Sequence, residues 1–183
     1  MSRQTKILII GGGAAGMTAA IFASRNGAKV IIVEQLPKVG RKILATGNGR
    51  CNLTNINIDI RRYHGNTVKF AYGALSRFGY LDTIQFFEDL GLHCIEEEGR
   101  IYPASLQASS VLDVLRYEMK TLGVEEICDA RVTEIIKDKS GFALKLKDKR
   151  MIHGDKVIVT TGGKANPGLG SNGSGYDLVR SFG

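Results

Sequence analysis

The chain has 183 residues, of which 43% are hydrophobic, and this share can form a buried core and excludes a chain that is disordered throughout. No apolar run approaches the roughly 20 residues of a membrane span, and no signal-peptide pattern opens the chain, so we expect a cytoplasmic protein without a membrane partner. Its length predicts one domain over residues 1–183.

The formal net charge of +7 is concentrated near the N-terminus. Residues 1–50 carry eight basic side chains and one acid, Glu34, whereas residues 51–183 carry 17 basic and 17 acidic side chains. A nucleic-acid surface more often spreads basic side chains along a face with aromatics between them. We therefore expect a compact anionic ligand and no nucleic acid, with a solvated basic edge as the alternative.

The first elements in chain order form a β-α-β unit. Residues 6–10 and 29–33 are apolar, β-branched runs typical of buried parallel strands, and residues 14–26 between them have helical spacing. A right-handed crossover makes the two strands parallel neighbours. For residues 34–57 we expect an ordered loop or a short helix at a functional site. Two helices are predicted to follow, over residues 67–79 and 82–90.

The second half of the chain combines helical and strand patterns. A capping box at Ser110 opens a helix that runs to Leu122, with Val111, Leu115 and either Met119 or Leu122 facing inward. Strands are predicted by alternating or continuous apolar runs. The runs predict a hairpin at 94–97 and 100–102, a strand at 126–130, an antiparallel meander at 132–137, 142–147 and 151–153, and a buried strand at 156–161. A glycine-rich loop at 164–175 and a helix at 176–182, ending at Gly183, complete the pattern, which predicts an α/β fold with a Rossmann-like parallel sheet and an antiparallel β-meander.

A glycine motif lies directly after the first strand. Gly11, Gly13 and Gly16 have the spacing of the dinucleotide fingerprint, and Glu34 lies 18 residues further on, at the end of the second strand. Gly11 permits the sharp turn, Gly13 lets a pyrophosphate approach the backbone, and Gly16 lets the helix pack closely on the strand. The alternative is a glycine-rich turn in another kind of α/β sheet.

The helix that opens at Ala14 and Ala15 directs unpaired amides and the positive end of its dipole at a ligand. Glu34 can accept hydrogen bonds from an adenosine ribose and disfavours a 2′-phosphate, which indicates FAD or NAD rather than NADP. The meander and the turn at Thr161, Gly162 and Gly163 favour FAD, because this strand and turn resemble the second FAD signature of glutathione-reductase-like flavoproteins. A common strand-terminating turn is the alternative for these three residues.

Three longer stretches, residues 40–55, 99–105 and 162–176, resemble bacterial NAD(P)/FAD-dependent oxidoreductases of the BaiN-type and aminoacetone-oxidase-like family. The resemblance covers essentially the whole chain. It implies FAD as the cofactor, NAD(P)H as a possible transient electron donor, and hydride transfer with a small organic substrate. It also implies that residues 1–183 are the FAD-binding, N-terminal portion of a longer flavoprotein, so that a substrate domain and a C-terminal return are missing or come from a partner chain.

The resemblance also implies which residues hold the cofactor. Pyrophosphate would lie on Gly11, Gly13, Ala14, Ala15 and Gly16, with Glu34 and Gln35 at the ribose. Arg41 and Lys42 would neutralise phosphate or orient their loop, and Arg131 and Val132 would cover the adenine. Thr161, Gly162 and Gly163 would also bind the cofactor. Backbone and polar groups near the flavin would come from Gly47, Asn48, Gly49, Arg50, Cys51 and Asn52.

The catalytic residues remain open at this point. Arg50 could equally be a surface charge and Cys51 a small buried hydrophobe. Cys51, Cys94 and Cys128 are too far apart for a zinc site or a dithiol relay, and the three histidines have no partner at a recognisable spacing, so we expect no metal. Besides a flavin-dependent oxidoreductase, two hypotheses stay open: a tRNA-modifying flavoprotein and a catalytically inactive, truncated FAD-binding module.

Overall fold

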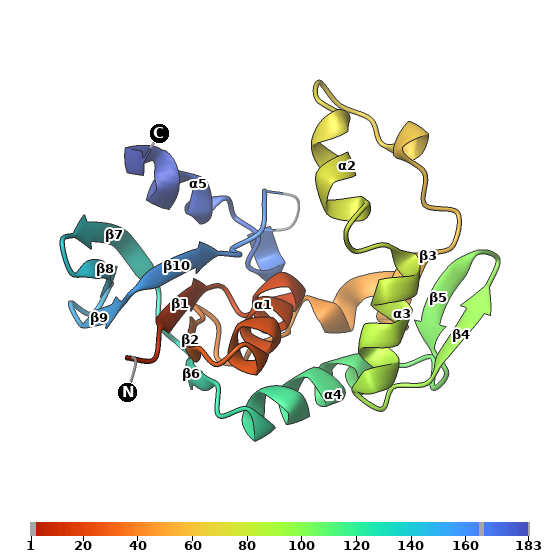
Figure 1. The fold of residues 1–183 in the computed structure, drawn as a ribbon, viewed down its shortest axis with the longest axis horizontal. Coiled ribbons are helices and arrows are strands. Elements are labelled where there is room, and N and C mark those ends of the chain that lie inside the picture. The colour runs from red at the N-terminus through yellow and green to blue at the C-terminus, as the bar shows by residue number, and fades with distance from the viewer. Residues whose placement is uncertain (1–2, 165–166, 183) are drawn as a thin grey trace. The chain divides into compact units, whose positions relative to one another are not determined.

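The computed structural model describes residues 3–164 and 167–182, whose elements are shown in Figure 1. The chain divides into two compact units, one made of residues 1–42 and 115–183 and the other of residues 43–114. The assignment of residues 1–183 to one domain stays a prediction. Ala165 and Asn166, within the predicted loop, and Gly183, the predicted helix end, lie outside the described residues.

The first unit contains a four-stranded parallel sheet in the order β10-β1-β2-β6. Its strands are β1 (Lys6–Ile10), β2 (Lys29–Val33), β6 (Glu125–Ile127) and β10 (Lys156–Val159). The helix α1 (Ala14–Arg25) connects β1 to β2 and contacts both strands. The predicted β-α-β unit is thus confirmed. The buried β-branched side chains of β1 and β2 are typical of parallel strands, which need cover on both faces of the sheet.

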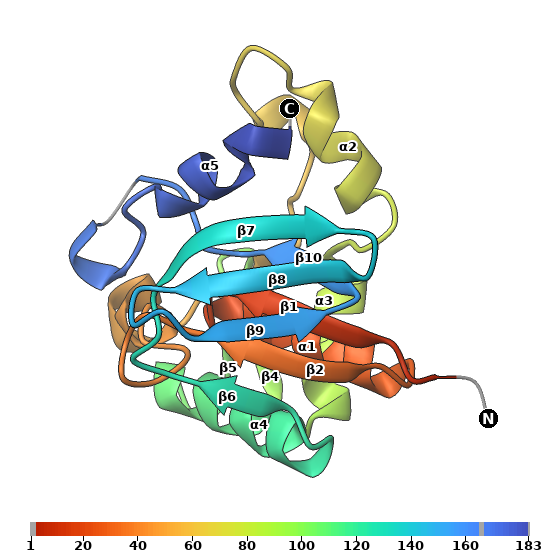
Figure 2. The ribbon, with the colours of Figure 1, turned by 90° about the vertical axis from the view of Figure 1, so that its left-hand side faces the viewer.

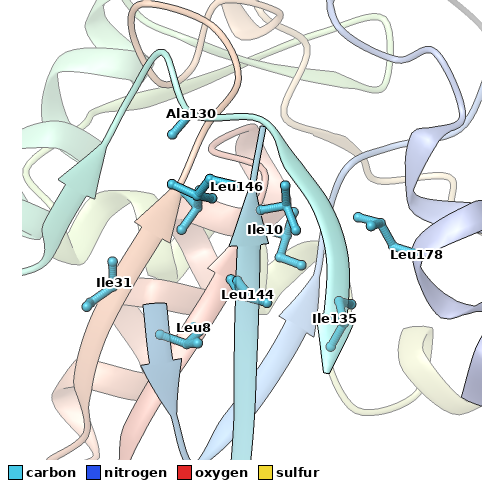
Figure 3. Packing of buried hydrophobic residues seen from close by; sticks show 10 residues of the cluster. Leu8, Ile10, Ile31, Ala130, Ile135, Leu144, Leu146 and Leu178 are labelled. Atoms are coloured by element: carbon cyan, nitrogen blue, oxygen red, sulfur yellow. The ribbon is translucent and has the colours of Figure 1, made fainter. Parts of the chain in front are cut away.

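The predicted meander is also confirmed. It consists of β7 (Val132–Asp138), β8 (Gly141–Leu146) and β9 (Met151–Gly154), which pair antiparallel in sequence order. Figure 2 shows these strands lying over the parallel sheet. Leu144 and Leu146 of β8 pack against Leu8 and Ile31 of the sheet, in one buried cluster (Figure 3). This packing joins the two sheets, since each buried aliphatic side chain contributes about 1.5–3 kcal/mol.

Leu178 completes the same cluster from α5 (Ser174–Val179). The sequence predicted this helix over residues 176–182, but its last residues form a 3-10 turn, η4 (Arg180–Phe182). Another 3-10 turn, η3 (Pro167–Leu169), lies in the preceding loop. The predicted strands at 126–130 and 156–161 both end early, at Ile127 and Val159.

The second unit holds a three-stranded antiparallel sheet in the order β3-β5-β4. The predicted hairpin is confirmed as β4 (Cys94–Glu97) and β5 (Arg100–Pro103), and the two-residue β3 (Thr54–Asn55) pairs with β5. The other elements are two 3-10 turns and two helices. They are η1 (Ile43–Gly49), η2 (Ile60–Arg62), α2 (Lys69–Leu75) and α3 (Tyr80–Asp89).

Two helix predictions need correction. The helix α4 (Ala108–Thr121) begins two residues before Ser110, so Ser110 is not its cap, and the Ser110 hydroxyl instead lies 2.8 Å from that of Ser105. Its predicted inward residues, Val111, Leu115 and Met119, are all buried. The helix predicted over 67–79 is shorter, and α2 buries none of its residues. No described helix is long and apolar enough to cross a membrane.

Candidate functional site

The turn after β1 uses its glycines in three different ways. Gly11 has φ of +101°, a left-handed conformation that glycine adopts most readily, and its amide donates to the Val33 carbonyl at 2.9 Å. A Cβ on Gly16 would lie 2.0 Å from the Gly11 carbonyl oxygen, so α1 packs against the turn too closely for any side chain. A Cβ on Gly13, in contrast, would meet no atom of the described residues within 4 Å. Open space therefore borders the turn at Gly13.

The N-terminus of α1 faces that open space without a cap. Gly13 is the N-cap residue, and no side chain caps the helix or places an acid in its first turn. Ala14 and Ala15 are exposed. Because the first amides of a helix lack intrahelical partners and carry the positive end of its dipole, this end can bind an anion.

Glu34 is held at the same turn. The residue is 8% exposed, and its carboxylate accepts hydrogen bonds from the Gly12 amide at 2.6 Å and from the Leu36 amide at 2.8 Å. Each oxygen receives one of these bonds, and a carboxylate has about four acceptor positions in all. The group is therefore oriented by the backbone and keeps the capacity to accept hydroxyl donors.

The ends of β2 and β6 bring the predicted adenine-covering residues close to Glu34. The Glu34 amide donates to the Ile127 carbonyl, and the Ala130 amide donates to the Glu34 carbonyl, both at 2.9 Å. The next residue, Arg131, is exposed and lines a surface hollow of about 330 Å³ together with Asp129, Lys147 and Asp148. Val132 is buried, so only its backbone could contact a ligand there.

The turn after β10 lies against the turn after β1. The Thr160 hydroxyl is within hydrogen-bonding distance of the Gly11 carbonyl, at 2.8 Å, and of the Ile10 carbonyl, at 3.0 Å. The neighbouring Thr161 packs on the start of α5, where a Cβ on Gly175 would lie 2.0 Å from its hydroxyl oxygen. Gly162 has φ of +74°, and Gly163 follows it near the Tyr176 hydroxyl. The two glycine turns thus meet at the carboxyl ends of adjacent parallel strands.

The loop before α5 engages two of the predicted residues. The Lys42 ammonium donates to the Ser171 hydroxyl at 2.8 Å, and the Gln35 side-chain amide donates to the Gly170 carbonyl at 3.2 Å. Arg41 is exposed. Of the two predicted phosphate-binding cations, Lys42 is therefore oriented by a protein contact, and Arg41 projects into solvent.

Three residues of the site, Gly12, Thr160 and Ser171, were not predicted from the sequence. Gly12 was the unassigned residue within the glycine motif, and Thr160 directly precedes a residue that was assigned. Their positions could have suggested them. Ser171 carries no such signal, because its contact with Lys42 spans 129 positions in the sequence.

The predicted residues from Gly47 to Asn52 form one tight turn in the second unit. Gly47, Asn48, Gly49 and Cys51 all have left-handed φ, between +53° and +82°. The Arg50 amide donates to the Gly47 carbonyl at 3.0 Å, and the Cys51 amide donates to the Thr46 carbonyl at 3.1 Å. These two bonds close the turn on itself.

The Arg50 side chain ties this turn to the hairpin of β4 and β5. Its guanidinium pairs with the Glu97 carboxylate and lies over the Tyr102 ring, with 4.2 Å from its carbon to the ring centroid. The hydrogen bond to Glu97 raises the pKa of Arg50. Its Nε atom is buried without a hydrogen-bond partner among the described residues. Arg50 is thus more than a solvated surface charge.

Two neighbours of Arg50 have structural contacts. The Asn52 side-chain amide lies 3.1 Å from the Thr54 carbonyl and 3.3 Å from the Ile101 carbonyl. Cys51 is buried, and burial raises the pKa of its thiol. A protonated, buried thiol is a poor nucleophile. Among the described residues, no group of three or more His, Cys, Asp or Glu side chains could hold a metal ion.

Comparison with known proteins gives close relatives over nearly the whole chain. The family described as the HI0933-like protein Rossmann domain matches residues 5–183. The chain is 47% identical over 182 residues to the 3-dehydro-bile acid delta(4,6)-reductase of Clostridium scindens, covering 98% of this chain and 44% of the relative. It is 33% identical over 177 residues to the ribosomal RNA dihydrouridine synthase of Escherichia coli, covering 96% and 44%. The chain therefore spans less than half the length of these relatives.

Solved structures share the fold. A flavocytochrome c3 fumarate reductase in its open conformation matches with a TM-score of 0.71 and 20% identity, over 100% of this chain and 41% of that one. CtdE in complex with FAD matches with a TM-score of 0.53 and 24% identity, over 91% and 41%. Both support the Rossmann-like assignment.

Proposed function

The chain belongs to the HI0933-like Rossmann-domain family, and from this premise we propose that it is the FAD-binding portion of a flavin-dependent oxidoreductase. One observation carries the proposal: the Glu34 carboxylate bonds the Gly12 amide, next to the open space at Gly13. A buried acid oriented by two amides, beside an uncapped helix N-terminus, fits a nucleotide that offers ribose hydroxyls and phosphates.

Different residues of the first unit would bind different parts of the cofactor. The diphosphate would bind the glycine turn and first turn of α1, at Gly11, Gly13, Ala14, Ala15 and Gly16. Glu34 would accept the ribose hydroxyls, with Gln35 holding the adjacent loop. The adenine would lie at the hollow beside Arg131 and the backbone of Val132. Thr161, Gly162, Gly163, Arg41 and Lys42 would border the phosphates and the flavin side.

The role of the second unit rests on the resemblance to the oxidoreductase family. Its turn from Gly47 to Asn52 would contribute backbone and polar groups to the flavin end. The several left-handed residues of this turn support that role, because such conformations concentrate where a backbone is held in one arrangement for binding. Arg50 and Asn52 would keep the turn in that arrangement through their contacts with the hairpin.

Bound FAD would supply hydride transfer to or from a small organic substrate. The names of the relatives support a narrower substrate class. A 3-dehydro bile acid with delta(4,6) unsaturation and a uridine ring both carry a carbon–carbon double bond conjugated with a carbonyl group. We therefore propose reduction of such a bond, with a small steroid-like molecule favoured by the 47% identical relative.

A second candidate function is reduction of a base in RNA. The 33% identity to a ribosomal RNA dihydrouridine synthase supports this function. The RNA-modifying hypothesis therefore stays open, with ribosomal RNA in place of transfer RNA as the proposed substrate. The two candidates share the cofactor and differ in the size and charge of the substrate. NAD(P)H as electron donor and a cytoplasmic location stay predictions.

Nucleotide binding by the purified chain tests the proposal. We expect mass spectrometry of the denatured protein to release FAD, or the colourless chain to take up added FAD with a visible flavin spectrum. Gly13→Val should weaken FAD binding at least tenfold, because its side chain would occupy the open space beside the turn. Gly73→Val is the control: a Cβ there also meets nothing within 4 Å, but Gly73 lies in α2. A chain that binds no FAD, or two variants with equal affinity, would contradict the assignment.

A further inference from the structure

The charges of the second unit are segregated along the chain. Residues 59–81 carry four basic side chains, Arg61, Arg62, Lys69 and Arg77, and one acid, Asp59. Residues 82–98 carry six acids and no lysine or arginine. The equal numbers of basic and acidic side chains over residues 51–183 therefore conceal a locally basic segment.

Three of the four basic side chains in this segment are available to a partner. Asp59 accepts from the Arg61 guanidinium at 2.9 Å and from the Arg61 amide at 2.8 Å, which holds the pKa of Asp59 far below its usual range. Arg62, Lys69 and Arg77 are exposed, and no described carboxylate lies within ion-pair distance of them. The net positive charge of the segment thus faces solvent.

Aromatic side chains lie between these cations along the chain. Phe70 is 86% exposed and Tyr72 is 61% exposed, both on α2, and Tyr63 is 37% exposed just after η2. α2 and η2 contact each other. Phe70 and Tyr72 are two positions apart, so their rings project from different sides of the helix, and the exposed surface extends around α2 rather than along one face of it. Because α2 buries none of its own residues and exposes two rings, its surface is open to a partner.

We propose that Arg62, Tyr63, Lys69, Phe70, Tyr72 and Arg77 form a surface that binds single-stranded RNA. We call these six residues the basic aromatic surface. Exposed rings can stack on unpaired bases, and the interleaved cations can contact phosphates, which is the combination that single-stranded nucleic acid requires. A membrane-binding helix needs a longer continuous apolar face than the seven residues of α2 provide.

The surface changes the expectation drawn from the sequence, where balanced charge after residue 50 argued against nucleic acid. The balanced charge after residue 50 includes a basic block at residues 59–81 and an acidic block at residues 82–98. The proposal deepens the second candidate function, on which it rests for the choice of RNA over DNA. The surface lies wholly within the second unit and shares no residue with the proposed cofactor site, so each can fail independently.

Fluorescence anisotropy with a labelled single-stranded 12-nucleotide RNA tests the surface. Phe70→Ala combined with Tyr72→Ala should weaken binding at least tenfold, since each stacked base contributes on the order of tenfold in affinity. Tyr117→Ala, which removes a 73% exposed tyrosine from α4, is the matched control and should leave affinity unchanged. Circular dichroism would establish that all variants remain folded.

Two double variants with the same change in net charge distinguish RNA binding at this surface from RNA binding through the overall charge of the chain. Arg62→Glu with Lys69→Glu should reduce the slope of log affinity against log salt by about 1.4, since each phosphate contact contributes about 0.7 on a single strand. Lys120→Glu with Lys139→Glu makes the same change in net charge at exposed positions outside the surface and should retain the original slope. Equal losses in both pairs would overturn the proposal.

Three other outcomes would also overturn it. These are the absence of RNA binding at low salt, a preference for duplex over single-stranded RNA, and tighter binding to vesicles containing phosphatidylserine than to RNA. Concentration-dependent self-association abolished by the Phe70 and Tyr72 substitutions would instead assign the surface to a second copy of the chain. FAD uptake measured on the same samples reports separately on the proposed cofactor site.

Discussion

A Cβ atom on Gly16 would lie 2.0 Å from the carbonyl oxygen of Gly11. This distance is far below any contact that two non-bonded atoms tolerate, so α1 and the turn after β1 can approach only with glycine at position 16. The requirement at Gly13 is different, because a Cβ there would meet open space. One motif thus combines a packing glycine with a ligand-facing glycine.

Gly16→Ala should therefore destabilise the fold itself. Forcing a methyl group into a filled contact costs about 1–3 kcal/mol, and FAD binding should fall together with stability. Urea unfolding monitored by circular dichroism would measure the loss. If the Gly16→Ala variant proved as stable as the parent chain, the turn would have to be able to move away from the helix.

Gly13→Ala should separate binding from stability. The substitution changes the N-cap of α1 and should cost less than about 1 kcal/mol of unfolding free energy. Its effect on FAD affinity should be larger, about tenfold, because the methyl group would occupy space beside the proposed diphosphate. Isothermal titration with FAD, with unfolding measured alongside, distinguishes the two effects. Parallel losses in both measurements would argue against a ligand at Gly13.

Glu34→Gln should weaken both the turn and the site. The glutamine amide offers one acceptor oxygen to the two amides of Gly12 and Leu36, so one buried donor loses its partner at a cost of about 1–3 kcal/mol. FAD affinity should also fall, since ribose hydroxyls would lose an acceptor. Glu125→Gln, at an exposed position of β6, is the matched control. The idea fails if both variants bind FAD as the parent does.

Arg50→Lys should loosen the turn from Gly47 to Asn52. Lysine cannot both lie flat over the Tyr102 ring and pair with Glu97 as the planar guanidinium does. We expect faster hydrogen exchange at the amides of Arg50 and Cys51, which close the turn. Arg100→Lys, an exposed change in the neighbouring strand β5, should leave that exchange unaltered. Unchanged exchange in the Arg50→Lys variant would contradict the positioning role.

Cysteine alkylation should be slow in the folded chain at neutral pH. Burial raises the pKa of Cys51, Cys94 and Cys128, so fewer thiolates form than in an unfolded chain. Because each folded pKa lies above the unfolded one, the associated stability is present below the unfolded pKa and is lost as pH rises through the folded value. Mass spectrometry after iodoacetamide treatment, with a urea-unfolded control, should find Cys51 the slowest to react. Rapid labelling of folded Cys51 at neutral pH would contradict this order.

The local elements were largely predictable from the sequence. The β-α-β unit, the hairpin at Glu98 and Gly99 and the meander each follow from short-range apolar patterns and turn residues, which act over a few positions. Predictions were weaker where ends depend on distant contacts. α4 begins at Ala108, and the Ser110 hydroxyl lies 2.8 Å from that of Ser105 instead of capping the helix. The helix predicted over 67–79 became the short, exposed α2, since no core lies against it.

By itself, the sequence determined the parallel sheet, the glycine turn and the identity of the acid at the end of β2, because periodicity and glycine spacing are local properties of the chain. Only the tertiary structure decided what those groups contact. It oriented Glu34 onto the Gly12 amide, brought Thr160 to the Gly11 carbonyl across 149 positions, and joined Lys42 to Ser171 across 129. The Thr160 contact depends on the pairing of β1 with β10, and the Lys42 contact depends on the approach of two loops. No local pattern encodes these long-range approaches.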